Sequence, residues 1–118
     1  MDLDFVLIEY HLAAPVALVE YKHHRAAIVD LGHPTYRALC ALADREPAIP
    51  FLVARYWPGT WAFAVQPVNA SAHRIFAGDV YLSEREYVTA LHRLRALTVQ
   101  QLVLRHLNTE RPPASRSA

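Results

Sequence analysis

The chain has 118 residues, of which 53% are apolar, and its formal net charge is +1. This length suits one compact domain, and the apolar share excludes a chain that is disordered throughout. The near-neutral charge excludes a general polycation, so a nucleic-acid contact must come from a local basic patch. No apolar run approaches the ~20 residues that span a bilayer, and the acidic start lacks the basic segment of a secretory signal. Together with a lone cysteine, Cys40, this predicts a cytoplasmic protein that is not in a membrane.

The first part of the chain predicts an antiparallel β-hairpin. Residues 2–10 and 15–22 are rich in bulky and β-branched side chains that run almost without interruption, which is typical of buried strands. The short stretch between them has a length that fits a hairpin connection. We expect residues 30–33 to form a loop that leads into a helix over residues 34–45.

The second part of the chain predicts another hairpin followed by helices. Residues 50–57 and 61–68 read as strands joined by a turn at Pro58-Gly59, and residues 69–82 read as irregular. Two capping boxes, Ser83 to Glu86 and Thr98 to Gln101, each predict the start of a helix. In the second helix we expect three apolar residues to face inward: Leu102, Val103 and Leu107.

These elements give the order β-β-α-β-β-α-α, which predicts an α/β or α+β layered fold with a mixed sheet of about four strands. We expect one domain over residues 1–108 and a disordered tail over 109–118, where prolines and serines gather.

The first hairpin brings charged residues to one place. A connection centred on Leu12-Ala13 sets Asp4 opposite Glu20 or, in the next register, opposite Lys22. Glu20 and Lys22 are two residues apart in one strand, so their side chains share a face. Directly opposed residues have Cβ atoms about 4.5–5.5 Å apart. We therefore expect Asp4, Glu20 and Lys22 to converge at one end of the hairpin.

This cluster has the parts of a metal-dependent hydrolytic site. Two close carboxylates repel unless a cation lies between them, and carboxylate oxygens suit Mg²⁺. Lys22 is the only lysine beside 11 arginines, and lysine is a compact charge that can change its protonation state. Its ammonium is suited to position a water molecule or to stabilise charge on a phosphoryl transition state.

The residues that carry this chemistry resemble the PD-(D/E)xK nuclease superfamily, which has the restriction-endonuclease-like fold. The matching features are Asp4, then Glu20-Tyr21-Lys22 across a hairpin, then a helix and another strand, over about residues 2–68. The resemblance implies that Asp4 and Glu20 ligate Mg²⁺, for which Mn²⁺ can substitute, and that Tyr21 offers its backbone carbonyl. It implies that Lys22 is catalytic. We expect an endonuclease rather than an exonuclease.

The chain departs from the family pattern in two places. No proline precedes Asp4, and Asp2 is an alternative to it because both share a face. The helix and strand that usually come before the Asp strand have no room here, so we expect a homodimer or a partner that supplies the missing helix. A non-catalytic module on the same fold, binding nucleic acid or protein, is the alternative function. An ordinary ion pair on a solvated strand end is the alternative for the cluster itself.

Basic and aromatic residues elsewhere predict the contacts to nucleic acid, with DNA favoured over RNA. The expected nucleic-acid contacts are His23 or His24, Arg25, Arg37 and Arg55, and an ordinary solvated surface is the alternative reading of the arginines. His23 and His24 are adjacent in a strand, so we expect them to point to opposite faces. Trp57 and Trp61 flank the turn at Pro58-Gly59, where a cross-strand aromatic pair is favoured over stacking on bases.

Overall fold

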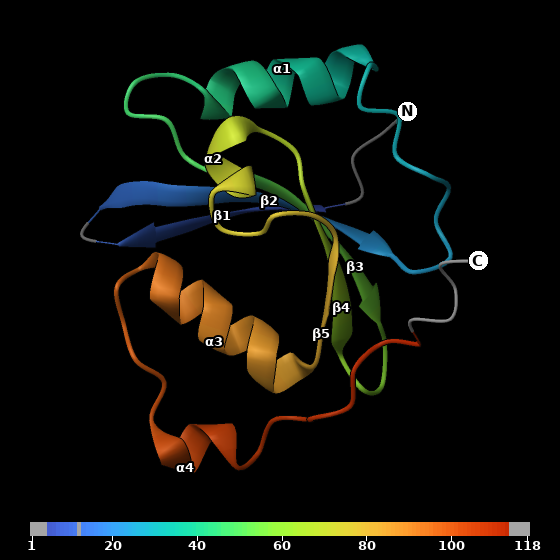
Figure 1. The fold of residues 1–118 in the computed structure, drawn as a ribbon, viewed down its shortest axis with the longest axis vertical. Helices are drawn as coiled ribbons and strands as arrows, with labels where there is room; N and C mark the ends of the chain where they lie inside the picture. Colours follow the sequence, from blue (N-terminus) through green and yellow to red (C-terminus); the bar gives the residue numbers. More distant parts are fainter. Residues whose placement is uncertain (1–4, 12, 114–118) are drawn as a thin grey trace.

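A computed structural model describes residues 5–11 and 13–113 of the chain. Its nine elements follow one another from the N-terminal strands to the C-terminal helices (Figure 1). In chain order they are β1 (Phe5–His11), β2 (Ala14–His23), α1 (Pro34–Ala43), β3 (Phe51–Trp57), β4 (Ala62–Pro67), α2 (Ala70–His73), β5 (Val80–Leu82), α3 (Glu84–Leu94) and α4 (Gln101–Leu104).

The five strands form one mixed sheet in which the spatial order repeats the chain order, β1-β2-β3-β4-β5. β1 and β2 form an antiparallel hairpin, and α1 then carries the chain across to β3, which runs parallel to β2. β4 and β5 continue the sheet in antiparallel fashion. The predicted mixed α+β class is confirmed, as are the two hairpins with a helix between them.

The prediction for residues 69–82 is wrong, because this segment contains α2 and β5 rather than irregular structure. α2 has 4 residues and β5 has 3, and such short elements leave no periodic pattern in the sequence. β5 raises the sheet from the expected four strands to five.

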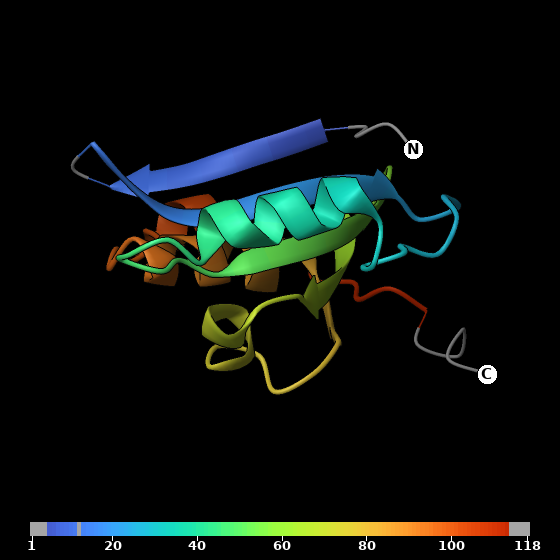
Figure 2. The same ribbon diagram turned by 90° about the horizontal axis from the view of Figure 1, so that it is seen from above.

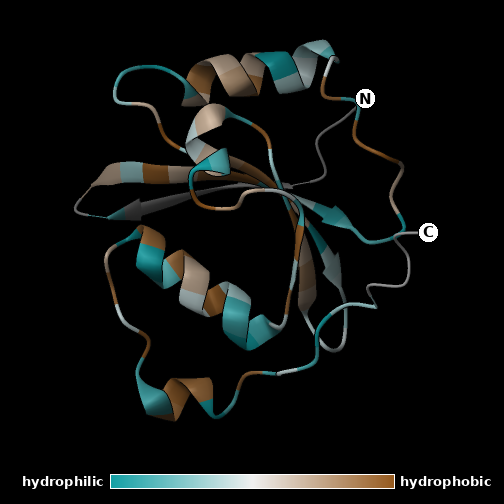
Figure 3. Ribbon diagram, in the orientation of Figure 1, coloured by the Kyte–Doolittle hydropathy of each residue, from teal (hydrophilic) through white to brown (hydrophobic). Residues whose placement is uncertain are grey.

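Helices α1 and α3 cover opposite faces of the sheet (Figures 1 and 2). Successive residues of β2 alternate between two cores: Leu18 packs with Tyr36 of α1, whereas Ala17 and Val19 pack with Tyr87 of α3. Figure 3 shows hydrophobic and hydrophilic bands alternating along α3, as expected for a helix with one buried face. The side of the sheet under α1 is called the α1 face below.

The buried side chain of Asn69 ties the ends of three elements together. Its carbonyl accepts hydrogen bonds from the backbone N–H of Phe51, at 2.9 Å, and of Ala72, at 3.0 Å. Its amide donates to Oδ1 of Asp44 at 2.9 Å and to the carbonyl of Ile49 at 2.9 Å. The C-terminal end of α1, the start of β3 and the first turn of α2 are therefore fixed relative to one another.

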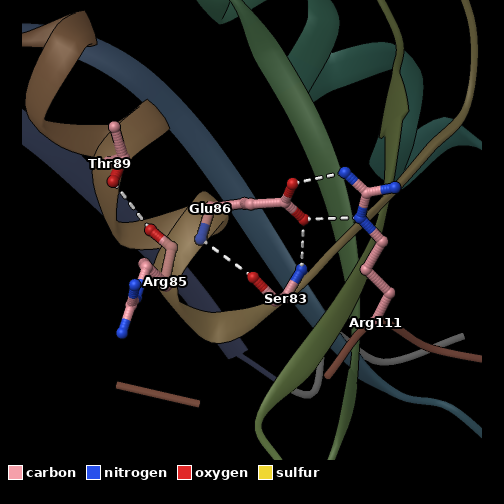
Figure 4. Close-up of polar contacts among 5 residues, drawn as sticks. All are labelled: Ser83, Arg85, Glu86, Thr89 and Arg111. Carbon is pink, nitrogen blue, oxygen red and sulfur yellow. Dashed lines mark hydrogen bonds and ion pairs between the residues drawn. The ribbon is translucent and has the colours of Figure 1, made fainter. Parts of the chain in front are cut away.

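The first predicted capping box is confirmed, and it carries a further contact (Figure 4). Ser83 Oγ accepts from the Glu86 N–H at 3.1 Å, and Glu86 Oε1 accepts from the Ser83 N–H at 2.9 Å. The guanidinium of Arg111 donates two hydrogen bonds to the same carboxylate, one of them from Nε to Oε1 at 2.8 Å. The segment after α4 is thereby held against the start of α3.

The second predicted capping box is wrong. α4 begins after Gln100, with no side chain accepting a hydrogen bond at its start. Leu102 and Val103 are 64% and 47% exposed, so they do not face inward. The helix has one turn, which is too short to present a buried face to the core. Among the residues that the structure describes, no helix is both long enough and apolar enough to span a membrane.

Candidate functional site

β2 places Glu20 and Lys22 on the α1 face, two and four residues after Leu18. In the hairpin, Val6 pairs with Glu20 and Phe5 pairs with Tyr21. Of the two predicted registers, this is the one that would set position 4 opposite Lys22. Asp4 lies outside the described residues, and so does its alternative Asp2. Their meeting with Glu20 and Lys22 stays a prediction.

Glu20 is fully buried, and the groups around it offset the cost of burying a carboxylate. The phenol of Tyr36 donates a hydrogen bond to Oε1 of Glu20 at 2.8 Å. The ammonium of Lys22 lies 3.8 Å from the same oxygen. Glu20 is 0% exposed and Lys22 is 6% exposed. Because an isolated buried charge is very unfavourable, the fold has to supply these partners. The pair is therefore not the solvated strand-end ion pair considered above.

Tyr36 is a site residue that sequence reasoning missed. It is 1% exposed in the core between α1 and the sheet. A signal was available, because a buried tyrosine brings a hydroxyl that needs a partner, whereas phenylalanine fills such a position without one. The hydroxyl at this position orients the Glu20 carboxylate.

Lys22 has a second basic residue beside it on the α1 face. In the parallel pairing of β2 with β3, Lys22 aligns with Arg55. The Arg55 guanidinium donates to the carbonyls of Ala26 at 2.9 Å and Ala27 at 2.7 Å. Arg55 was predicted to contact nucleic acid. The structure gives it a role in holding the loop after β2 against the sheet, close to the Glu20–Lys22 pair.

The expectation that His23 and His24 point to opposite faces is wrong. Their rings are stacked, with centroids 4.5 Å apart. The strand ends at His23, and the backbone turns at once, with the Ala26 N–H donating to the His23 carbonyl at 2.9 Å. Strand alternation therefore no longer applies at His24. His23 Nδ1 accepts a hydrogen bond from the Arg25 N–H at 3.1 Å.

Trp57 and Trp61 do not form the expected cross-strand pair with each other. Trp57 stacks on His24, with centroids 5.0 Å apart and planes 16° apart. Trp61 stacks on Tyr56 at 5.8 Å, in a turn where its backbone has a φ of +53°. His23 meets Tyr56 edge to face at 5.5 Å. These contacts join five rings into one series across the end of the sheet. This ring column runs Trp57, His24, His23, Tyr56 and Trp61.

Two adjoining hollows open on the α1 face beside the Glu20–Lys22 pair. The larger has a volume of about 550 Å³, and the smaller of about 160 Å³. Both are lined by Arg55, Ala64 and Tyr81. The larger is also lined by His24, Arg25, Trp57 and Pro113, and the smaller also by Val53, Val65, Gln66 and Asp79. Three of the predicted nucleic-acid contacts, His24, Arg25 and Arg55, therefore meet at the larger hollow.

Arg37 stands apart from those three residues. It is exposed on α1 and lines a separate hollow of about 410 Å³, together with Tyr36, Cys40 and Asp44. Burial raises the pKa of the Cys40 thiol, and the Asp44 carboxylate beside it raises that pKa further. A thiol held in its protonated form is a poor metal ligand.

Among the residues whose side chains the structure describes, no group of three His, Cys, Asp or Glu residues is placed to hold a metal ion. The predicted ligand set includes Asp4, which lies outside that part of the chain. No protein-family model, no curated protein and no solved structure matches this chain.

Proposed function

We propose that this protein is a magnesium-dependent nuclease of the PD-(D/E)xK type, which hydrolyses phosphodiester bonds within nucleic acid. Asp4, Glu20 and the backbone carbonyl of Tyr21 hold the metal, and Lys22 is the catalytic cation. The observation that carries the proposal is the Glu20–Lys22 pair, whose Nζ and Oε1 atoms lie 3.8 Å apart, buried on one face of β2.

The burial of this pair supports a role beyond stability. A buried ion pair is often no more stabilising than apolar residues of similar volume, and sometimes less. β2 is otherwise apolar where it faces α1 and α3, so an apolar residue at position 20 would fit its surroundings. The chain also places its only lysine at position 22. A catalytic role explains the buried Glu20 and Lys22 charges better than a contribution to folding stability does.

The order of elements also agrees with the resemblance. A hairpin carries the Glu-x-Lys segment on its second strand, and α1 then crosses to a neighbouring parallel strand. This is the succession of hairpin, helix and strand that the resemblance requires.

The donor set fits a hard divalent cation. Carboxylate and carbonyl oxygens are the ligands that Mg²⁺ takes in proteins, and Mn²⁺ accepts the same set. Bound there, Mg²⁺ would polarise a phosphoryl oxygen and lower the pKa of a water ligand. Tyr36 fixes the Glu20 carboxylate through its 2.8 Å hydrogen bond, so the carboxylate is oriented before a ligand arrives.

Lys22 serves the reaction as a point charge near the scissile phosphate. Its ammonium holds the attacking water or stabilises the negative charge that grows on the phosphoryl oxygens. Arg55, its neighbour in β3, adds positive potential on the same face. We place the protein in the cytoplasm, because its lone cysteine suits a reducing compartment, and we favour DNA over RNA as the substrate.

A second candidate function is a binding module that uses this fold without turnover. The observation that favours it is the depth of Glu20, which is 0% exposed and lines neither hollow on the α1 face. A carboxylate so enclosed also fits a purely structural pair with Tyr36 and Lys22. The two candidates differ in whether the chain cuts nucleic acid.

Cleavage with Mn²⁺ decides between the two candidates. The parent protein should cut a closed circular substrate, which has no ends for an exonuclease. Lys22→Ala and Lys22→Arg should lose about 100-fold or more of that rate while staying folded. Lys22→Ala should also melt at a lower temperature, because it leaves the buried Glu20 carboxylate without its cation, whereas Lys22→Arg keeps that charge. The matched control is Arg93→Lys on exposed α3 surface, which should cut like the parent. Cutting by Lys22→Arg at the parent rate contradicts the catalytic role. A parent that cuts neither single-stranded, double-stranded nor branched substrates favours the binding module.

A further inference from the structure

The ring column and the larger hollow beside it have no part in the proposed hydrolysis. The column crosses the end of the sheet, because Tyr56 packs against the core under α3 whereas Trp57 lines the larger hollow on the α1 face. Three of the five rings, Trp57, His24 and His23, form a continuous stack with interplanar angles of 16° and 29°. Trp57 is the last ring of that stack, and it lines the 550 Å³ hollow together with His24. A flat aromatic ligand that enters the hollow therefore meets the end of an existing stack.

We propose that this hollow binds an unstacked base of a single-stranded nucleic acid, which stacks on Trp57, the end ring of the stack, while Arg25 contacts its phosphate. The biological meaning of the proposal rests on the nuclease function above, since it names the form of nucleic acid that reaches the same face. The binding itself requires no metal.

The chemistry of the lining selects this class of ligand. Aromatic side chains stack on bases regardless of base identity, because every base has a π-face. Arg25 is exposed at the rim of the hollow, where a guanidinium can pair with phosphate oxygens. Aromatic rings beside a basic rim are the two features that proteins combine to bind single strands.

Double-stranded nucleic acid does not offer the same group. In a duplex each base is stacked between its neighbours, so neither ring face is available to a tryptophan. Only a single-stranded or flipped nucleotide presents a base that can enter a hollow of this size. The proposal therefore commits to single strands over duplexes.

The position of the hollow links base binding to the Glu20–Lys22 pair. Arg55 lines the hollow and aligns with Lys22 on the neighbouring strand. Neighbouring strands lie about 4.8 Å apart. A nucleotide whose base rests on Trp57 therefore brings its backbone close to the cation that we assign to phosphate chemistry.

The two tryptophans of the chain provide a matched fluorescence experiment. Each single variant, Trp57→Leu or Trp61→Leu, leaves one tryptophan as reporter. The probes are single-stranded DNA and single-stranded RNA of about 8 nucleotides, within the site size of small binding folds, and a DNA duplex of the same length. All titrations are made in EDTA, so that no cleavage occurs. The two single-stranded probes distinguish DNA from RNA as the source of the base.

We expect a single strand to quench the emission of Trp57 in the Trp61→Leu protein, with the parent affinity. Trp57→Leu should weaken binding about 10-fold, as expected from the loss of one stacked base. Trp57→Phe, which keeps an aromatic face, should recover most of the affinity, and equal melting temperatures of the variants exclude unfolding. Equal affinity in Trp57→Leu and Trp61→Leu, or a duplex bound as tightly as either single strand, overturns the proposal.

The role of Arg25 is tested by salt. Arg25→Gln should lower the slope of log affinity against log salt by about 0.7, the share of one phosphate contact in a single strand. The control Arg93→Gln, on α3 beyond the other face of the sheet, should leave the slope unchanged. Equal slopes in both variants contradict the phosphate contact.

The base-binding proposal and the nuclease proposal fail in different ways. Glu20→Gln should bind single strands like the parent in EDTA, even though it no longer cuts. Binding without cutting in the parent sinks the nuclease proposal alone. Cutting by a protein whose Trp57→Leu variant binds single strands at full strength sinks the base-binding proposal alone.

Discussion

The phenol of Tyr36 in α1 donates a 2.8 Å hydrogen bond to Oε1 of Glu20 in β2, and both side chains are buried. This contact joins the crossover helix to the strand that carries the proposed catalytic residues. The packing of α1 against the sheet therefore also fixes the orientation of the Glu20 carboxylate. Disturbing either residue should affect both the stability of the fold and the geometry of the site.

Removing the Tyr36 hydroxyl should destabilise the protein measurably. Tyr36→Phe takes a donor from a buried carboxylate, and we expect a loss of about 1–3 kcal/mol in the free energy of unfolding. Urea denaturation followed by circular dichroism measures it. The matched control is Tyr81→Phe in β5, a partly exposed tyrosine, which should change stability by less than about 0.5 kcal/mol. Similar losses in both variants would show that the contact to Glu20 contributes little.

Divalent metal should stabilise the folded protein, because a ligand that binds only the folded state favours it. At a Mn²⁺ or Mg²⁺ concentration about 100 times the dissociation constant, the gain is about 2.7 kcal/mol. Thermal melts with and without metal measure it. Asp4→Ala and Glu20→Gln should remove the gain, and Asp79→Ala, an exposed carboxylate in the smaller hollow, should keep it. A metal response that persists in both site variants leaves a structural role for Glu20.

The two capping-box sequences should differ in their effect on stability. Ser83 caps α3 through the Glu86 N–H, so Ser83→Ala should cost about 1 kcal/mol. Thr98 makes no cap for α4, whose N-cap residue is Gln100, so Thr98→Ala should change stability by less than about 0.5 kcal/mol. Chemical denaturation of the two alanine variants compares them directly. Equal losses would mean that Thr98 supports the start of α4 in solution.

Glu86 should contribute to the acid sensitivity of the fold. The hydrogen bond from Arg111, helped by those from Ser83, lowers the pKa of Glu86 from 4.5 to about 2. A carboxyl with a lowered folded pKa stabilises the protein above its unfolded pKa. That contribution disappears as the pH falls from about 4.5 to about 2. The effect is modest, because the Glu86 side chain is 35% exposed and solvent screens the pair.

Stability measured across that pH window tests the prediction for Glu86. Glu86→Gln should flatten the loss of stability with acid, whereas Glu110→Gln, an exposed glutamate near the same pair, should leave the parent slope. A parent slope retained in Glu86→Gln would show that the lowered pKa has no consequence for folding.

The sequence predicted the larger elements because long apolar segments and strong turn signals mark them. β2 and β3 lie within a residue or two of the expected ranges, and Ser83 begins α3 as expected. The short elements α2 and β5 were missed, since 3 or 4 residues carry no period. Thr98 shows the opposite error: the capping-box sequence Thr98 to Gln101 is present, but Thr98 does not cap α4.

The candidate site was only partly predictable, because distant segments complete it. The shared face of Glu20 and Lys22 follows from strand alternation alone. Tyr36 reaches the site from α1, through its hydrogen bond to Glu20. The Trp57–His24 stack forms where β2 ends at His23 and the chain turns. Neither contact has a local signature, since each depends on how α1 and β3 dock on β2. The parallel alignment of Lys22 with Arg55 likewise required the crossover to be known.

The matching of strand order to chain order has a consequence for how this chain reaches its native state. Three of the strand pairings are antiparallel between consecutive strands, and such local contacts form early, hairpins within microseconds. The pairing of β2 with β3 is the exception, because residues 24–50 must be looped out before any of its contacts form. We expect this closure to limit the folding rate. β2, the proposed catalytic strand, would then be paired with β1 before α1 packs over it.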